Sequence, residues 1–125
     1  MTSGNRKKTP DMSAGSPIDF GELNEIMNND AGLMRECFDD FLSDYPDLMA
    51  ALRAAVDACA FDAVENTAHK LKGILKYLAA GPAAEAALAV ETAGRVQDPE
   101  NLAEKLAVLE SRCSQAIDVI NTPPE

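Results

Sequence analysis

The 125-residue chain has no tryptophan, one histidine and only 5% aromatic residues. Strand-favouring Val, Ile, Phe and Tyr are sparse whereas Ala and Leu abound, so the composition favours helices over strands. No apolar run reaches the roughly 18 residues of a membrane-spanning helix. No apolar stretch follows the basic residues near the start either, which argues against a signal peptide. We therefore expect a cytoplasmic protein.

Basic residues are also scarce, with 11 Lys and Arg against 21 Asp and Glu, for a net charge of −10. Such a chain repels phosphates, which argues against nucleic acid or an anionic membrane as the main partner. Cys37, Cys59 and Cys113 cannot all pair, and none lies in a C-x-x-C spacing. We interpret them as small buried side chains in a reducing compartment.

Several kinds of site lack their sequence signature. One histidine without a cysteine pair cannot make a zinc site, so no metal site is expected. The chain has neither G-x-x-x-x-G-K-[ST] nor G-x-G-x-x-G, so no nucleotide site is expected. A hydrophobic fraction of 46% is nevertheless enough to bury one core in a chain of this length.

The chain divides into one domain and two tails. Residues 1–17 are polar, rich in Gly, Pro and Ser, and predicted to be a disordered tail. Helical spacing of apolar residues begins at 18 and ends near 121, which leaves 122–125 as a short C-terminal tail. The length fits a single domain over 18–121.

Within this domain the apolar spacing predicts five helices. They are expected near residues 19–28, 31–58, 61–79, 82–95 and 99–121. Because the connections are short, we predict an all-α fold, an up-down four-helix bundle with a short N-terminal capping helix.

Capping residues and prolines set the predicted boundaries. Asp30 suits the N-cap of the second helix, and Pro46 is expected to kink that helix without ending it. Gly81 suits the position just after the third helix, and Pro82 suits the first turn of the fourth. Asp98 followed by a proline predicts the start of the fifth helix.

The single histidine is expected to face solvent. On a helical wheel of about 100° per residue, His69 lies about 140° from the centre of the apolar arc of the third helix. That arc contains Phe61, Val64, Ala68, Leu71, Ile74, Leu75 and Leu78. A lone histidine is more often a hydrogen-bonded core residue, but this wheel position argues against that interpretation.

Three lysines accompany this histidine in an otherwise acidic chain. Lys72 and Lys76 share its face, and Lys70 is adjacent. A neutral imidazole can attack a phosphoryl group while a nearby lysine neutralises its oxygens. Gly73, one turn after His69, removes bulk that would obstruct a partner. Alternatively, the lysines are an ordinary solvated face, and Gly73 serves the packing of a neighbouring helix.

The stretch ENTAHKLKGILKYLAAGPAAEAALAVETAGR, with its A-H-x-L-K-G core, resembles the histidine-containing phosphotransfer (HPt) domains of phosphorelays. The upstream FDDFLSDYPDLMAALRAAV looks similar to the segment before the histidine helix of that family. The resemblance covers roughly residues 18–120. It implies that His69 accepts a phosphoryl group from a receiver-domain aspartate and passes it to another receiver, without an ATP site of its own.

The resemblance also assigns roles around the histidine. It implies that Lys72 stabilises the phosphoryl group, that Gly73 leaves room for the receiver, and that the receiver supplies Mg²⁺. We further predict that Lys76, Glu65 and Lys70 contribute to partner binding, and that the chain is a monomer. The sequence departs from the family at two places. Members often carry Gly where this chain has Lys76, and Gly-Ala where it has residues 79–80.

Two other functions are considered. An HPt-like bundle can dock on a receiver or a histidine kinase and regulate it without being phosphorylated. An enzyme that uses His69 as a general base would need a cleft, and a convex helix surface offers none.

Overall fold

Four long antiparallel helices and one short helix make up the described part of the chain. The structure is a computed structural model that describes residues 16–121, and no strand occurs in this range. The helices are α2 (Phe20–Ile26), α3 (Ala31–Asp57), α4 (Phe61–Tyr77), α5 (Gly81–Arg95) and α6 (Leu102–Asn121). No helix in this range is both long enough and apolar enough to span a bilayer.

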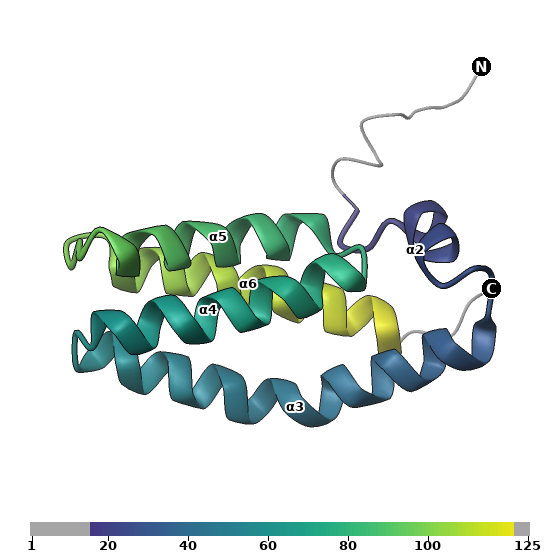
Figure 1. Ribbon diagram of the computed structural model, residues 1–125, viewed down its shortest axis with the longest axis horizontal. Helices are drawn as coiled ribbons and strands as arrows, with labels where there is room; N and C mark the ends of the chain where they lie inside the picture. The colour runs from purple at the N-terminus through teal and green to yellow at the C-terminus, as the bar shows by residue number, and fades with distance from the viewer. Residues whose placement is uncertain (1–15, 122–125) are drawn as a thin grey trace, which may run out of the picture.

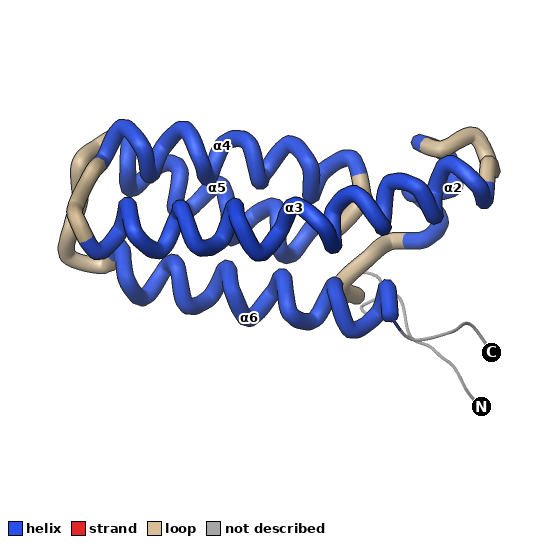
Figure 2. The backbone as a smooth tube through the Cα atoms, turned by 90° about the horizontal axis from the view of Figure 1, so that it is seen from below, coloured by secondary structure: helices blue, strands red, loops and turns tan. Residues whose placement is uncertain are grey.

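The four long helices close into a bundle around one apolar core. α4 packs on α5, α5 on α6, and α3 on both α4 and α6 (Figures 1 and 2). Successive connections lie at alternate ends of the bundle, so neighbouring helices run antiparallel. The prediction of an all-α, up-down four-helix bundle is therefore confirmed.

The short helix α2 lies at the end of the bundle where α4 connects to α5 (Figure 1). Leu23 of α2 is fully buried, as are Ile18 before the helix and Met27 directly after it. The backbone N–H of Asp19 donates to the carbonyl of Ala79 at 2.9 Å, which joins this segment to the α4–α5 connection. The predicted capping role of the first helix is confirmed.

Side-chain caps define the starts of α2 and α3. The carboxylate of Asp30 accepts a hydrogen bond from the backbone N–H of Leu33 at 3.0 Å, so the predicted N-cap is confirmed. Asp19 caps α2 in the same way. α3 continues through Pro46 as one helix of 27 residues, as predicted, and Figure 1 shows it as a curved helix.

Two predicted boundaries are wrong. Gly81 is the first residue of α5, and the left-handed residue after α4 is Ala79, with φ of 56°. Asp98 and Pro99 do not begin the last helix, because Asp98 instead accepts a hydrogen bond from the N–H of Glu100 in a turn. α6 begins only at Leu102.

Two further expectations concern the tails and the cysteines. The N-terminal tail predicted over 1–17 lies outside the described residues apart from its last two, and the tail over 122–125 lies outside them completely. The expectation that all three cysteines are buried is wrong. Cys113 is buried and Cys37 partly so, but Cys59 is exposed in the α3–α4 connection.

Candidate functional site

The outward face of α4 carries the histidine. The side chain of His69 is 67% exposed, while Val64, Ala68, Leu71 and Leu75 of the same helix are buried. The helical wheel thus predicted the orientation of His69 correctly, and this residue is not part of the core.

Beside His69 lies a buried carboxylate on the neighbouring helix. Glu91 of α5 is only 5% exposed, and it is the one charged residue buried among residues 16–121. Its neighbours along α5 are mainly alanines, which are also buried. Burying a charge is costly unless that charge is paired, so its partners decide its role.

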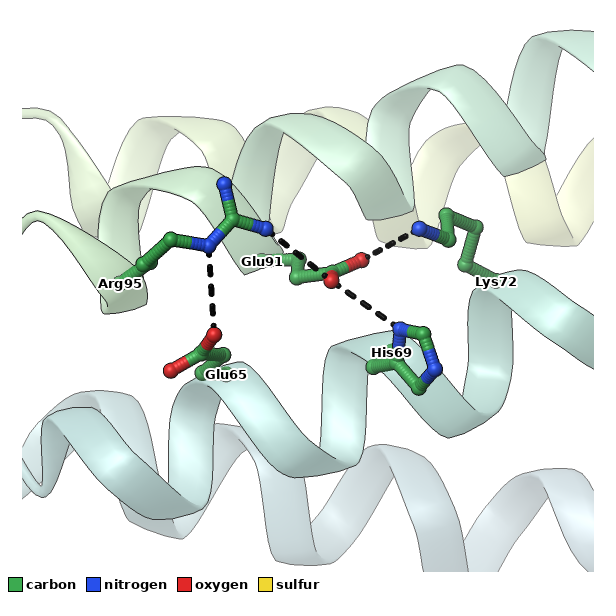
Figure 3. Close-up of polar contacts among 5 residues, drawn as sticks. All are labelled: Glu65, His69, Lys72, Glu91 and Arg95. Atoms are coloured by element: carbon green, nitrogen blue, oxygen red, sulfur yellow. Dashed lines mark hydrogen bonds and ion pairs between the residues drawn. The ribbon is translucent and has the colours of Figure 1, made fainter.

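Three cationic or hydrogen-bonding side chains surround this carboxylate (Figure 3). Oε2 lies 3.0 Å from Nδ1 of His69 and 3.2 Å from a guanidinium nitrogen of Arg95. Oε1 lies 2.8 Å from Nζ of Lys72. Since Oε1 has no hydrogen bond of good geometry, its contact with Lys72 is an ion pair.

These contacts keep Glu91 ionised. Burial alone would raise the pKa of Glu91, but the contacts with Lys72 and His69 outweigh burial and lower it below its ordinary value. An ionised carboxylate only accepts hydrogen bonds, so Nδ1 of His69 must carry the hydrogen. In the neutral ring the lone pair then lies on Nε2, which has no partner within the described range.

Arg95 supports Glu91 from the next turn of α5. Its Nε lies 3.3 Å from Oε2 of Glu65 on α4, while its guanidinium also contacts Glu91. Arg95 therefore bridges the two helices on one side of His69, and Lys72 contacts Glu91 on the other side (Figure 3).

A glycine sets the spacing between α4 and α5. A Cβ on Gly94 would lie 2.9 Å from the backbone nitrogen of Glu65 and 3.1 Å from the carbonyl oxygen of Phe61. Only a residue without a side chain permits this approach. The close packing brings Glu91, nearly one turn before Gly94, against His69, which lies one turn after Glu65.

The other predicted site residues occupy different positions around His69. A Cβ on Gly73 would meet no atom within 4 Å, so the alternative that this glycine serves internal packing is wrong. Lys70 and Lys76 are exposed and line separate grooves on the two sides of α4. Lys72 is only 18% exposed, because it reaches toward Glu91. Glu65 pairs with Arg95 of α5 at the surface of the bundle.

Sequence reasoning missed Glu91, Arg95 and the role of Gly94. A signal was present, because Ala84, Ala87, Glu91 and Gly94 fall on one face of α5 at helical spacing. A glutamate within an otherwise small and apolar stripe indicates a buried carboxylate that needs a partner. The helical wheel of the predicted third helix alone could not show which helix would supply the carboxylate beside His69.

Comparison with known protein families identifies the family of the chain. Residues 36–119 match the Hpt domain family, and the chain belongs to that family. Hpt domains are phosphotransfer intermediates of phosphorelays that interact with receiver domains, and they are typically not classed as enzymes. No curated protein and no solved structure matches the chain.

Proposed function

We propose that His69 is the phosphoacceptor, which takes a phosphoryl group from an aspartyl phosphate of one receiver domain and gives it to another. The observation that carries this proposal is the hydrogen bond between Nδ1 of His69 and the buried Glu91 carboxylate. It fixes the ring and leaves Nε2 exposed on a convex surface, where a second protein can reach it.

In the transfer step the Nε2 lone pair attacks phosphorus and forms the N–P bond. The P–O bond to the receiver aspartate breaks, and the electron pair leaves with the aspartate carboxylate. No proton has to leave His69, because Nδ1 keeps its hydrogen. The ring becomes cationic, and the adjacent Glu91 carboxylate offsets that charge. The return step to a second receiver reverses these changes.

Lys72 is positioned to act on the phosphoryl oxygens. It lies nearly one turn after His69, and its ammonium group is already held at Glu91, 2.8 Å from Oε1. When a phosphoryl group arrives at Nε2, Lys72 can share its charge between Glu91 and the phosphoryl oxygens. Arg95 remains on Glu91, so the buried carboxylate does not lose all its partners.

The remaining predicted residues fit a docking role. Open space at Gly73 leaves room for a receiver surface one turn from His69. Exposed Lys70 and Lys76 flank that position, and Mg²⁺ would come with the receiver. We propose that the chain acts as a monomer in this exchange.

The direct test is incubation with phosphorylated, labelled receivers from the same genome. We expect acid-labile, base-stable phosphate on the chain and none on the His69→Gln variant, which keeps a polar side chain of similar size. Phosphate on this variant would place the acceptor elsewhere. Receiver binding without any phosphate on the wild type would instead establish the non-phosphorylated docking module.

A further inference from the structure

Two cations contact the buried Glu91 carboxylate through different oxygens, and they differ in what else holds them. Lys72 lies 2.8 Å from Oε1 and has no second carboxylate partner among residues 16–121. Arg95 lies 3.2 Å from Oε2, and it also lies 3.3 Å from a carboxylate oxygen of Glu65. A guanidinium group presents a rigid fork of donors, whereas an ammonium group is a point charge on a flexible chain. Arg95 is therefore the fixed partner of Glu91, and Lys72 is the partner that can move.

Movement of Lys72 toward a phosphoryl group has a cost at Glu91. Oε1 is buried and has no hydrogen bond within the described residues, so the ammonium of Lys72 is its only counter-charge. Removal of one partner from a buried ion pair is strongly destabilising when nothing compensates the remaining charge. His69 donates a hydrogen bond to Oε2, but its ring is neutral until the N–P bond forms. As Lys72 turns away, Arg95 is the one full positive charge left on this carboxylate.

We propose that Arg95 is a positioning residue for phosphoryl transfer, because it compensates Glu91 while Lys72 turns toward the phosphoryl oxygens. The proposal rests on the phosphoacceptor role of His69 and adds the residue that makes Lys72 available. Without Arg95, Lys72 would be the sole cation on a buried carboxylate and would stay there. The phosphoryl group would then lack its counter-charge although His69, Lys72 and Glu91 are all present.

The contact with Glu65 keeps Arg95 from taking the place of Lys72. Arg95 lies in the last turn of α5, on the side of Glu91 opposite Lys72 (Figure 3). Its Nε is held by Glu65 of α4 while another guanidinium nitrogen contacts Glu91. A cation in the last turn of a helix is also stabilised by the helix dipole. These contacts hold the guanidinium in place, so the two cations have separate tasks.

The alternative is that Arg95 only joins α4 to α5, and the chain offers a matched control for it. Arg53 and Glu110 form an ion pair between α3 and α6. The side chains of the two arginines are equally exposed, at 51% for Arg95 and 52% for Arg53, and their partners Glu65 and Glu110 are both 34% exposed. Loss of either arginine breaks one ion pair between helices, but only Arg95 contacts Glu91. A difference between the two variants therefore reports on Glu91.

Phosphorylation by the small phosphodonor phosphoramidate measures the effect on the rate without a receiver. We expect Arg95→Gln to react roughly tenfold more slowly than wild type, the scale of one charge-assisted contact. Arg95→Lys should recover most of the rate, because it keeps a cation beside Glu91. Arg53→Gln should react at the wild-type rate. Equal rates for Arg95→Gln and Arg53→Gln would overturn the proposal.

The position of Lys72 in the phosphorylated protein is tested by a ³¹P NMR titration. In the wild type the nearby ammonium should lower the pKa of the phosphoryl group by about one unit relative to the Lys72→Ala variant. In Arg95→Gln, where Lys72 stays on Glu91, the phosphoryl pKa should equal that of Lys72→Ala. About 0.5 M salt screens the direct effect of the lost Arg95 charge. A wild-type phosphoryl pKa in Arg95→Gln would overturn the proposal, because a purely structural arginine leaves Lys72 free to move.

The two proposals fail in distinguishable ways. If the wild type carries phosphate on His69 but Arg95→Gln reacts and titrates like Arg53→Gln, the positioning role of Arg95 fails alone. If neither receivers nor phosphoramidate phosphorylate His69 of the wild type, the phosphoacceptor role fails and the role of Arg95 fails with it.

Discussion

Glu91 on α5 accepts a hydrogen bond from His69 on α4, with 3.0 Å between Oε2 and Nδ1. The carboxylate is buried, whereas most of the imidazole is exposed. One side of the ring is thus held by the bundle while the other side faces solvent. A surface histidine on a mobile side chain would sample many orientations, but this one is presented with Nε2 outward.

Substitution of Glu91 should separate the effect of the hydrogen bond from that of the charge. In Glu91→Ala the ring loses its anchor, and we expect phosphorylation by phosphoramidate to slow roughly tenfold or more, the scale of one charge-assisted contact. Glu91→Gln keeps an oxygen that can accept from Nδ1, so its loss should be smaller. Glu85→Ala, an exposed acid on the same helix, is the control. Equal rates in all three variants would contradict the positioning role.

The same carboxylate predicts a pH dependence of stability. The pKa of Glu91 is lowered below its ordinary value near 4.5, because its contacts with Lys72 and His69 outweigh the effect of burial. Ionised Glu91 therefore stabilises the fold above that ordinary value, and the stabilisation is lost as pH falls through the lower folded-state pKa. The Tm difference between wild type and Glu91→Gln should be fully present near neutrality and shrink as the pH falls below about 4.5. A constant difference would contradict this linkage.

Substitution by alanine should change the stability of the protein in opposite directions at two glycines. Gly94→Ala forces a methyl group against the backbone of α4 and should destabilise the protein by about 1–3 kcal/mol. Gly73→Ala meets no neighbouring atom and should stabilise α4 by up to about 1 kcal/mol. Denaturant unfolding measures both changes. A destabilised Gly73→Ala variant would show that this glycine is needed for the fold.

The lysines should differ in their effect on transfer. Lys72→Ala removes the cation that contacts Glu91, and transfer from receivers should slow roughly tenfold. Lys70→Ala should matter less, because Lys70 points about 100° away from His69 on the helix and has no ion pair within the described residues. Single-turnover kinetics with one receiver measures both. Similar losses would mean that only the total positive charge of this face matters.

The sequence predicted the helices well because their apolar stripes are regular. It failed at the ends of two helices, where tertiary contacts decide. Ala79 takes the left-handed conformation although Gly81 is nearby, and its carbonyl accepts from Asp19 of a segment 60 residues earlier. Asp98 has the chemistry of an N-cap, but it accepts from Glu100 within a turn. Local preference cannot decide between such arrangements.

For the site, the wheel of one helix correctly predicted the exposure of His69. It could not predict the anchor of His69, because Glu91 is 22 residues away on another helix. That pairing depends on the close approach of α4 and α5 at Gly94. A search for charged residues on the apolar face of each helix would have singled out Glu91, and only the packing of α5 on α4 identifies its partner.

The most direct test of this account is the identity of the phosphorylated ring nitrogen. The chain, labelled with ¹⁵N and phosphorylated by a receiver, is studied by NMR with long-range correlations from the ring hydrogens of His69 to its nitrogens and to phosphorus. Since Glu91 holds Nδ1–H, we predict that phosphorus is bound to Nε2 and that Nδ1 keeps its hydrogen. Phosphorus on Nδ1, or on any residue other than His69, would contradict the account.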